Sequence, residues 1–423
     1  MAQVSRRGLS VRACVFLAAS LGLGACVAEP PGGRYGRAPV AVGLPGGPPD
    51  AGAGRRVAIL LPLTGSNAEL GQSMLRAAQM VLEGPDAPAL DARDTGGTPE
   101  GAAAAARAAL EGGAGLILGP LTSPETAVVS PVARAAGVPV LAFTSDVAQA
   151  QQGVWTLGIT PGQQARRLVQ AVQAENKTRL AAVVPQNPFG TALADGYVSA
   201  AAAAGLPEPR VLRYTGGFAN LNNALKDVSG YSSRRGSIED QQRQARARGD
   251  ADSRRATADA GQQELPAAPI DALLLGAAGD QLGQAAPLLA FYDIGPGQVR
   301  ILGPALWARE APRLSALSGA WYAAPDPSAR VAFERRFAAR YNAPPRDLAS
   351  LAYDAAGIAR VAADRTGFPI TSLIRPEGFA GADGVVALNP DGSVRRGLAV
   401  FEIGGGGSRV VQPAPATLTA PGT

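Results

Sequence analysis

Histidine is absent from this 423-residue chain, and cysteine occurs only at Cys14 and Cys26. The absence of histidine excludes Ser-His-Asp and Cys-His catalysis, and with so little cysteine it also excludes the usual zinc sites. Lysine occurs only at Lys177 and Lys226, and neither stands in a recognisable catalytic motif. Chemistry based on carboxylates or serine is left open, but no carboxylate pair stands in a matching motif. We therefore expect a protein that is not an enzyme and that uses no cofactor or metal.

The basic charge of the chain does not indicate a nucleic-acid site. Lys and Arg total 39 against 34 Asp and Glu, which gives a formal net charge of +5. The basic residues are scattered, and no stretch interleaves them with aromatic side chains that could stack on bases. We expect no nucleic-acid partner, and a mild attraction to anionic lipid or to the anionic cell wall is the simpler interpretation.

The N-terminus has the pattern of an export signal. Arginines precede the stretch 13–23, which is apolar or small apart from one serine. That stretch is shorter than the roughly 20 apolar residues that span a bilayer, as in a secretory signal. It ends at Leu23-Gly24-Ala25-Cys26, which resembles the bacterial lipobox, in which the peptidase cuts before the cysteine and that cysteine receives the lipid. We therefore predict a signal peptide over residues 1–25 and lipidation of Cys26.

An ordinary signal peptide with an incidental cysteine is the alternative. With lipidation, the protein is periplasmic and anchored to a cell membrane. Val27 follows the cysteine, where an aspartate would favour retention in the inner membrane, so the outer membrane is favoured. Cys14 would leave with the signal, and the mature body would then have no free thiol and no disulfide.

Beyond the N-terminus, the patterns indicate alternating strands and helices. Residues 26–54 are rich in Pro, Gly and Ala and read as a flexible tether. From Arg56 onward, short apolar runs alternate with helical periods, which is typical of βαβ units and parallel sheets. The expected strands are 57–61, 90–94, 115–118, 138–143, 178–184, 210–214, 271–275, 298–302 and 320–323. The fold class we predict is therefore α/β, with two Rossmann-like lobes and a hinge.

The lobes are expected to interleave along the chain. The first comprises residues 55–158 plus about 345–375, and the second comprises 159–344 plus about 376–411. Segment 232–264 is charged and nearly free of large apolar residues, so it forms no core; it is either a disordered insert, a solvated helix, or a protruding partner-binding element. Residues 385–388 and 398–403 are expected to pair as a hairpin, and 412–423 to form a disordered tail.

Ligands of open parallel sheets bind beyond the carboxyl ends of the strands. One such end is followed by Thr122, Ser123 and Pro124, a typical helix start. Free backbone N–H groups and the helix dipole at this point can hold a carboxylate. Simple helix capping explains the same residues equally well, and both roles are compatible. Aromatic residues Trp307, Trp321 and Tyr322 could line a pocket, although packing in the core is the commoner role.

Several segments share the order and spacing of a known family. They are Val57-Ala-Ile-Leu-Leu-Pro-Leu-Thr-Gly65, Leu118-Gly-Pro-Leu-Thr-Ser123, Val138-Pro-Val-Leu-Ala-Phe-Thr-Ser145 and Phe189-Gly190. Together they resemble the type I periplasmic-binding-protein superfamily, in particular its leucine/isoleucine/valine-binding branch. The resemblance implies that the Ala142 carbonyl and the Thr144 hydroxyl meet a ligand's ammonium. Phe189 stands where the family usually has tyrosine, and Asp280 is the candidate for the ammonium's acidic partner, with Asp146 a poorer one.

Further segments resemble the penicillin-binding-protein activator lipoproteins. They are the lipobox, Gly158-Ile-Thr-Pro-Gly-Gln-Gln164, Asp271-Ala-Leu-Leu-Leu-Gly-Ala-Ala-Gly-Asp280 and Ile301-Leu-Gly-Pro-Ala-Leu-Trp307. This resemblance implies a regulator that docks on a peptidoglycan synthase. The alternative is a receptor that delivers leucine or another amino acid to an ABC permease, and a third reading is an orphan sensor that uses the same two-lobed clamp.

Overall fold

The computed structural model describes residues 55–248 and 265–418. The predicted signal peptide, the lipidation site Cys26 and the tether lie outside these residues, as do 249–264 and 419–423. In the described part of the chain, no helix is long and apolar enough to cross a membrane.

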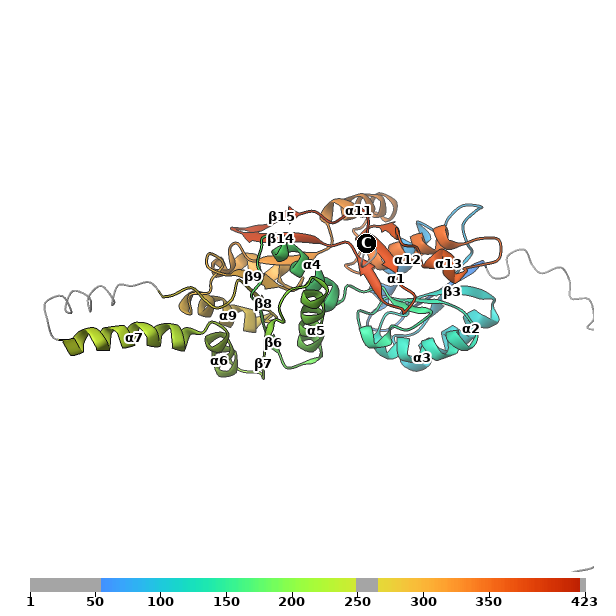
Figure 1. The fold of residues 1–423 in the computed structure, drawn as a ribbon. Coiled ribbons are helices and arrows are strands. Elements are labelled where there is room, and N and C mark those ends of the chain that lie inside the picture. The colour runs from blue at the N-terminus through green and yellow to red at the C-terminus, as the bar shows by residue number, and fades with distance from the viewer. Residues whose placement is uncertain (1–54, 249–264, 419–423) are drawn as a thin grey trace, which may run out of the picture. The chain divides into compact units, whose positions relative to one another are not determined.

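The first of two large sheets has five parallel strands in the order β2-β1-β3-β4-β5. Helices α1 and α12 pack on one face, and α2 and α3 on the other (Figure 1). Strand β1, between β2 and β3, is buried on both faces except at its first residue, as its unbroken apolar run predicts. The elements are β1 (Arg56–Leu61), α1 (Ala68–Gln79), β2 (Leu90–Asp94), α2 (Pro99–Glu111), β3 (Ala114–Leu118), α3 (Ser123–Ala135), β4 (Val140–Ala142), η1 (Val147–Gln149), β5 (Val154–Thr156) and α12 (Ala349–Ala362).

The second sheet has seven strands in the order β15-β14-β10-β9-β8-β6-β7. Strands β6 to β10 run parallel, and β14 and β15 add an antiparallel edge. Helices α4 and α5 cover one face, and α6 and α9 the other. The elements are α4 (Pro161–Gln173), β6 (Leu180–Pro185), α5 (Pro188–Ala203), β7 (Arg210–Tyr214), α6 (Phe218–Val228), α7 (Tyr231–Arg248), β8 (Ala272–Leu275), α9 (Asp280–Phe291), β9 (Arg300–Gly303), α10 (Trp307–Glu310), η2 (Ala311–Arg313), η3 (Ser315–Leu317), β10 (Trp321–Ala324), β14 (Ala399–Gly404) and β15 (Gly407–Gln412).

The predicted α/β fold with two parallel sheets is therefore confirmed. One local cause of this fold lies at three helix starts, where a threonine stands one or two residues before a proline. Thr98, Thr122 and Thr160 each accept a hydrogen bond from the backbone three residues on, and the following helix begins with or near the proline. These starts turn the chain back over the sheet directly after a strand or its loop.

The predicted hairpin of 385–388 with 398–403 is wrong. β12 (Gly384–Leu388) pairs with β13 (Val394–Arg396), whereas β14 crosses to the second sheet and pairs with β10. Together with β11 (Phe379–Gly381), β12 and β13 form a third, small sheet. A short run of alternating apolar residues does not specify which neighbour it pairs with, and packing against the large cores decides it.

The small sheet packs on the core of the first sheet. Phe379, Val386, Leu388 and Val394 are buried in that core, whereas the sequence places residues from about 376 in the second lobe. The helix α11 (Pro327–Tyr341) also packs on this side, through Phe333 and other residues that contact α1 and α12 residues. A short helix, α13 (Ile370–Leu373), precedes β11. The boundaries of the two lobes that the sequence analysis gives stay a prediction.

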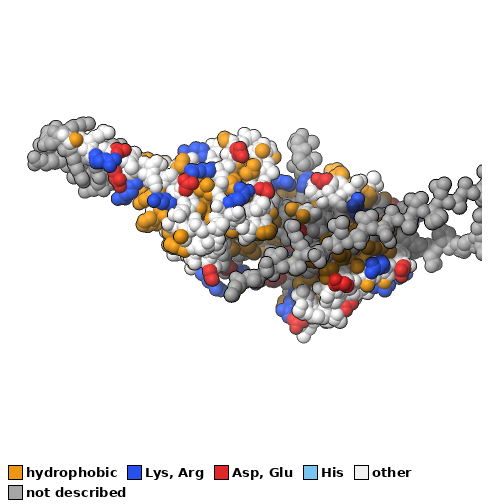
Figure 2. Space-filling view, turned by 90° about the horizontal axis from the view of Figure 1, so that it is seen from below, with side chains coloured by type: hydrophobic (Ala, Val, Ile, Leu, Met, Phe, Trp, Pro, Cys, Tyr) orange, Lys and Arg blue, Asp and Glu red, His pale blue; other side chains and the backbone are white. Residues whose placement is uncertain are grey.

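The charged insert begins as a helix. α7 spans the first half of the segment 232–264 and extends away from the helices over the second sheet (Figure 1). At its base, Tyr231 stacks on Phe291 and meets Tyr292 edge-on, and hydrophobic side chains gather on the body where the helix begins (Figure 2). Arg234 anchors the first turn by donating to the carbonyls of Pro266 and Tyr292 and to the Asp293 carboxylate. Residues 232–248 are thus helical, which fits both a solvated helix and a protruding partner-binding element.

Candidate functional site

The carboxyl edge of the first sheet gathers four of the residues singled out in the sequence. After β3, Thr122 caps α3 and Ser123 is the first residue of that helix; Thr144 and Asp146 follow β4. Since β3 and β4 are neighbouring parallel strands, their carboxyl ends bring these loops together. The residues could hold the polar end of a small ligand if their hydrogen-bonding groups were free.

Thr122 is engaged at the start of α3. Its hydroxyl donates to Oε2 of Glu125 at 2.7 Å, and its backbone N–H donates to the same oxygen at 3.0 Å. The Thr122 hydroxyl in turn accepts from the Glu125 backbone, which completes a capping box. Glu125 is fully buried. Helix capping therefore occupies the hydroxyl that the carboxylate-binding role requires.

Ser123 is engaged as well. Its hydroxyl donates to Oδ2 of Asp146. Asp146 also accepts from the Ala148 backbone at 3.0 Å and from the Gln149 amide at 3.3 Å. The hydrogen bond from Ser123 is the largest cause that holds the pKa of Asp146 below its usual value. The carboxylate is therefore charged at neutral pH and occupies the hydroxyl of Ser123, one of the residues predicted to meet a ligand's carboxylate.

The residues predicted to meet an ammonium are partly engaged. The Ala142 carbonyl accepts the backbone N–H of Leu157 at 2.7 Å, within the pairing of β4 and β5. The Thr144 hydroxyl accepts the backbone N–H of Asp146 at 3.1 Å and keeps its proton for another acceptor. Of the predicted contacts on this sheet, the Thr144 hydroxyl is the one with a hydrogen left to donate.

A second carboxylate at this edge has a structural role that the sequence analysis missed. Asp94, at the end of β2, accepts hydrogen bonds from the Thr64 hydroxyl (2.7 Å) and from the backbone N–H groups of Leu63 and Gly96 (both 2.8 Å). Burial raises the pKa of Asp94, but these hydrogen bonds outweigh it and lower the pKa overall. A carboxylate directly after a strand and opposite a Thr-Gly turn is the sequence signal that could have found it.

On the second sheet, the predicted residues lie at the carboxyl edge but in different surroundings. Phe189 is half-buried in the first turn of α5 and packs on the core below. Asp280 is exposed as the first residue of α9. The backbone N–H of Gly279, just before it, donates to Glu310 at 2.7 Å, a contact that the sequence did not indicate. Exposure leaves Asp280 hydrated, so the cost of leaving it unpaired is small.

The aromatic residues Trp307, Trp321 and Tyr322 are buried in the two cores of the second sheet. Core packing, the commoner role, therefore applies to all three. They do not line a pocket that the structure describes.

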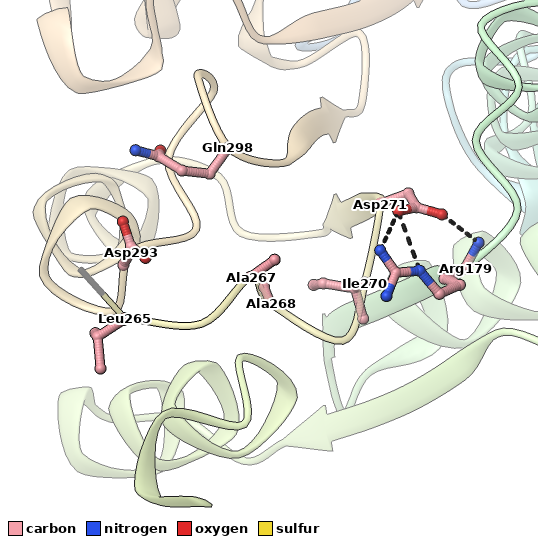
Figure 3. A pocket seen from close by; sticks show the side chains of 8 residues that line it. All are labelled: Arg179, Leu265, Ala267, Ala268, Ile270, Asp271, Asp293 and Gln298. Atoms are coloured by element: carbon pink, nitrogen blue, oxygen red, sulfur yellow. Dashed lines mark hydrogen bonds and ion pairs between the residues drawn. The ribbon is translucent and has the colours of Figure 1, made fainter. Parts of the chain in front are cut away.

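A pocket lies at the opposite edge of the second sheet (Figure 3). Arg179 and Asp271 stand directly before β6 and β8, at the amino ends of these strands, and form an ion pair with an N–O distance of 2.6 Å. The pocket has a volume of about 650 Å³ and is also lined by Leu265, Ile270 and Asp293, among others. The hydrogen bond from Arg179 is the main cause that lowers the pKa of Asp271 to about 2. No residue predicted to bind a ligand lines this pocket.

Comparison with known proteins supports the fold. Residues 55–227 match the family model described as periplasmic binding protein. A structure from Rhodospirillum rubrum described as a branched-chain amino acid ABC transporter has a TM-score of 0.63 at 17% identity and covers 84% of this chain and 99% of that one. The C-domain of LpoA from Haemophilus influenzae, described as a regulator of PBP1A, has a TM-score of 0.60 at 14% identity, with 84% and 99% covered. Full-length LpoA has a TM-score of 0.61 at 14% identity; the match covers 85% of this chain and 59% of LpoA. No curated protein matches the chain.

Proposed function

We propose that this chain, which has the two-sheet α/β fold of the type I periplasmic binding proteins, is a non-catalytic envelope lipoprotein that regulates a peptidoglycan synthase. The observation that carries the proposal is the engagement of the amino-acid-binding groups. The Thr122 hydroxyl binds Glu125, and the Ser123 hydroxyl binds Asp146. Both hydroxyls belong to residues that were predicted to meet a ligand's carboxylate, and neither keeps a hydrogen to donate to it.

Electrostatics support the same conclusion. Asp146 is charged at neutral pH and shares its oxygen with Ser123, so an incoming carboxylate would meet like charge at about hydrogen-bonding distance. Displacing Asp146 would also break the hydrogen bonds that it accepts from the Ala148 backbone and the Gln149 amide. An empty or repurposed clamp that presents its surface to a protein fits this arrangement better than a solute carrier.

The partner we propose is a class of cell-wall synthase, which the lipid on Cys26 would bring within reach at the membrane. The resemblance to activator lipoproteins motivates this choice, and the LpoA C-domain shows the same fold at low identity. Surface immobilisation of the chain and titration with a purified bifunctional peptidoglycan synthase should give saturable binding, and addition of the chain should change the rate of glycan polymerisation or crosslinking. Absence of both effects would remove the proposal.

The importer receptor is the second candidate, because the Thr144 hydroxyl still has a proton to donate and the similar R. rubrum structure is described as part of a branched-chain amino acid transporter. Thermal unfolding with leucine, isoleucine, valine and the other amino acids at millimolar concentration separates the two candidates. We expect no shift. A ligand at 100 times its Kd would instead add about 2.7 kcal/mol. A shift that Thr144→Val abolishes would establish the receptor and overturn the regulator.

The anchor has a separate test. Mass spectrometry of the protein expressed with its own N-terminus should show a diacylglycerol-modified Cys26 at the start of the mature chain, and Cys26→Ser should release the protein from the membrane fraction. An unmodified N-terminus at another residue would contradict the lipoprotein assignment and leave the ordinary signal peptide.

A further inference from the structure

The chain passes between the two large sheets three times. The first connection follows β5 and leads into α4, the second leads from β10 into α11, and the third joins β13 to β14. Beside these connections lies a group of charged and polar side chains, all buried except the half-buried Arg330, which we name the charge cluster. It consists of Arg330, Ser350, Asp354, Asp383 and Arg396.

Arg396 ties the third connection to the first. It is the last residue of β13, and its Nη1 lies 3.3 Å from Oδ2 of Asp354 on α12. Its Nη2 donates to the carbonyl of Leu157, directly after β5, at 3.0 Å. The side chains of Arg396 and Asp354 are both completely buried. One guanidinium therefore holds two of the three connections on the body of the first sheet.

Arg330 ties the second connection to the same place. It lies on α11, and its Nε donates to Oδ1 of Asp383 at 2.9 Å. Oδ2 of Asp383 accepts the Ser350 hydroxyl of α12 at 2.7 Å. Asp383 itself lies in the turn between β11 and β12, and 1% of its side chain is exposed. Residues at all three connections thus take part in one hydrogen-bond network around the buried carboxylates of Asp354 and Asp383.

Asp354 is the most confined member. It accepts the backbone N–H of Ala382 at 2.5 Å and that of Asp383 at 3.4 Å. The charged groups that face it are Arg396 from β13 and Asp383 from the β11–β12 turn, while Arg330 of α11 faces Asp383. Among the described residues, no acceptor is within hydrogen-bond distance of the buried Nε of Arg396. The packed network therefore leaves one donor unsatisfied, which favours any state in which water reaches it.

We propose that the charge cluster is a proton-sensitive latch, which holds the three connections on the first sheet and sets how freely they move. The cluster joins chain segments up to 239 residues apart, from Leu157 to Arg396, and lies beside the connections at which a hinge between the two sheet bodies would bend. Hydration of the ionised carboxylates opposes the packed state, because a buried charge loses its water.

The protonation of Asp354 decides whether the packed state of the cluster becomes more or less favourable as the pH rises. Burial raises the pKa of Asp354 to about 6; the charge of Arg396 opposes this shift, and that of Asp383 adds to it. The packed cluster therefore binds a proton more tightly than a hydrated cluster, in which the carboxyl has its ordinary pKa of 3.8. The packed state is favoured as the pH falls through about 6 and loses that advantage as the pH rises. With these two values, the ratio of packed to hydrated states falls about tenfold between pH 5 and pH 7.5.

Hydrogen exchange on the full chain tests the latch. Protection factors, corrected for the intrinsic pH dependence of exchange, are measured for peptides that cover 156–162 and 394–399. In the wild-type protein we expect them to fall about tenfold from pH 5 to pH 7.5, while peptides of the strands in the sheet centre keep their protection. Equal protection of the connections at both pH values, or higher protection at pH 7.5, would overturn the proposal.

Two variants make the assignment specific. Asp354→Asn keeps the size of the side chain but cannot ionise, so we expect protection of the connections that no longer depends on pH. Asp271→Asn is the matched control, since that carboxyl lies at the far edge of the second sheet and has a pKa of about 2, outside the tested range; it should leave the pH dependence intact. A pH dependence that persists in a folded Asp354→Asn variant would refute the role of Asp354. If that variant does not fold, the wild-type titration alone decides.

Discussion

Trp307 offers a sharp test of how the second sheet is held together. Its indole N–H donates at 2.8 Å to the carbonyl of Ala277, two residues after the end of β8, and both residues are fully buried. Trp307→Phe keeps an aromatic ring but removes the donor. The Ala277 carbonyl would then be buried without a partner, which costs about 1–3 kcal/mol. The smaller ring leaves a cavity that adds about 1–2 kcal/mol.

Trp321→Phe is the matched control. This indole is also buried in the second sheet, but its N–H donates to Oε2 of Glu402 at 3.1 Å, and 23% of the Glu402 side chain is exposed. Water can hydrogen-bond to Glu402 in place of the lost indole donor. Trp321→Phe therefore has the cost of a cavity but not the cost of an unsatisfied buried acceptor. We expect Trp307→Phe to lower the free energy of unfolding by about 1–3 kcal/mol more than Trp321→Phe.

Equilibrium urea unfolding at neutral pH, followed by circular dichroism, measures this difference directly. The two variants should unfold with the same slope against urea concentration as the wild type, because the area exposed on unfolding hardly changes. Equal losses of stability in the two variants, or a larger loss for Trp321→Phe, would refute the argument that the buried Ala277 carbonyl depends on Trp307.

Three further predictions concern single contacts. Asp271→Asn should lower the free energy of unfolding by up to about 1 kcal/mol at pH 7, because Arg179 is 56% exposed and surface ion pairs are weak. This contribution is present above pH 3.8 and disappears as the pH falls towards 2. Urea unfolding across the acid range measures it. Gly381→Ala would place a Cβ 2.5 Å from Cγ of Asp354 and should cost about 1–3 kcal/mol in denaturant unfolding; an unchanged midpoint would show that the turn moves aside freely. Thr160→Ala removes the cap of α4 and should cost about 1 kcal/mol, seen as a lower Tm, whereas Thr160→Ser should retain most of the stability.

Much of the fold was predictable from local sequence. The apolar runs that form β1, β3 and β6 are buried on both faces of parallel sheets, and their pattern needs no partner to be recognised. α6 was missed although Leu221, Leu225 and Val228 have helical spacing and are buried. The intervening asparagines obscured a period that was present.

The position of the candidate site was predictable from the sequence, but the hydrogen bonds of its side chains were not. Thr122, Ser123 and Thr144 lie at one sheet edge, as strand order along the chain implies. That the Ser123 hydroxyl is bound by Asp146 depends on how the loop after β4 folds back, 23 residues further along the chain. Spacing in sequence does not specify such a contact, and it decides whether the site has a donor left for a ligand.

By itself, the sequence determined the absence of histidine chemistry, the alternation of strands and helices, and the helix starts, because each depends on residue type or on neighbours within one turn. Only the tertiary structure decided that β13 and β14 belong to different sheets, that Trp307 and Trp321 are core residues, and that Asp354 and Arg396 meet beside Leu157. These outcomes depend on which of several equally apolar or equally charged surfaces pack together, and that choice is made by the free energy of the whole core.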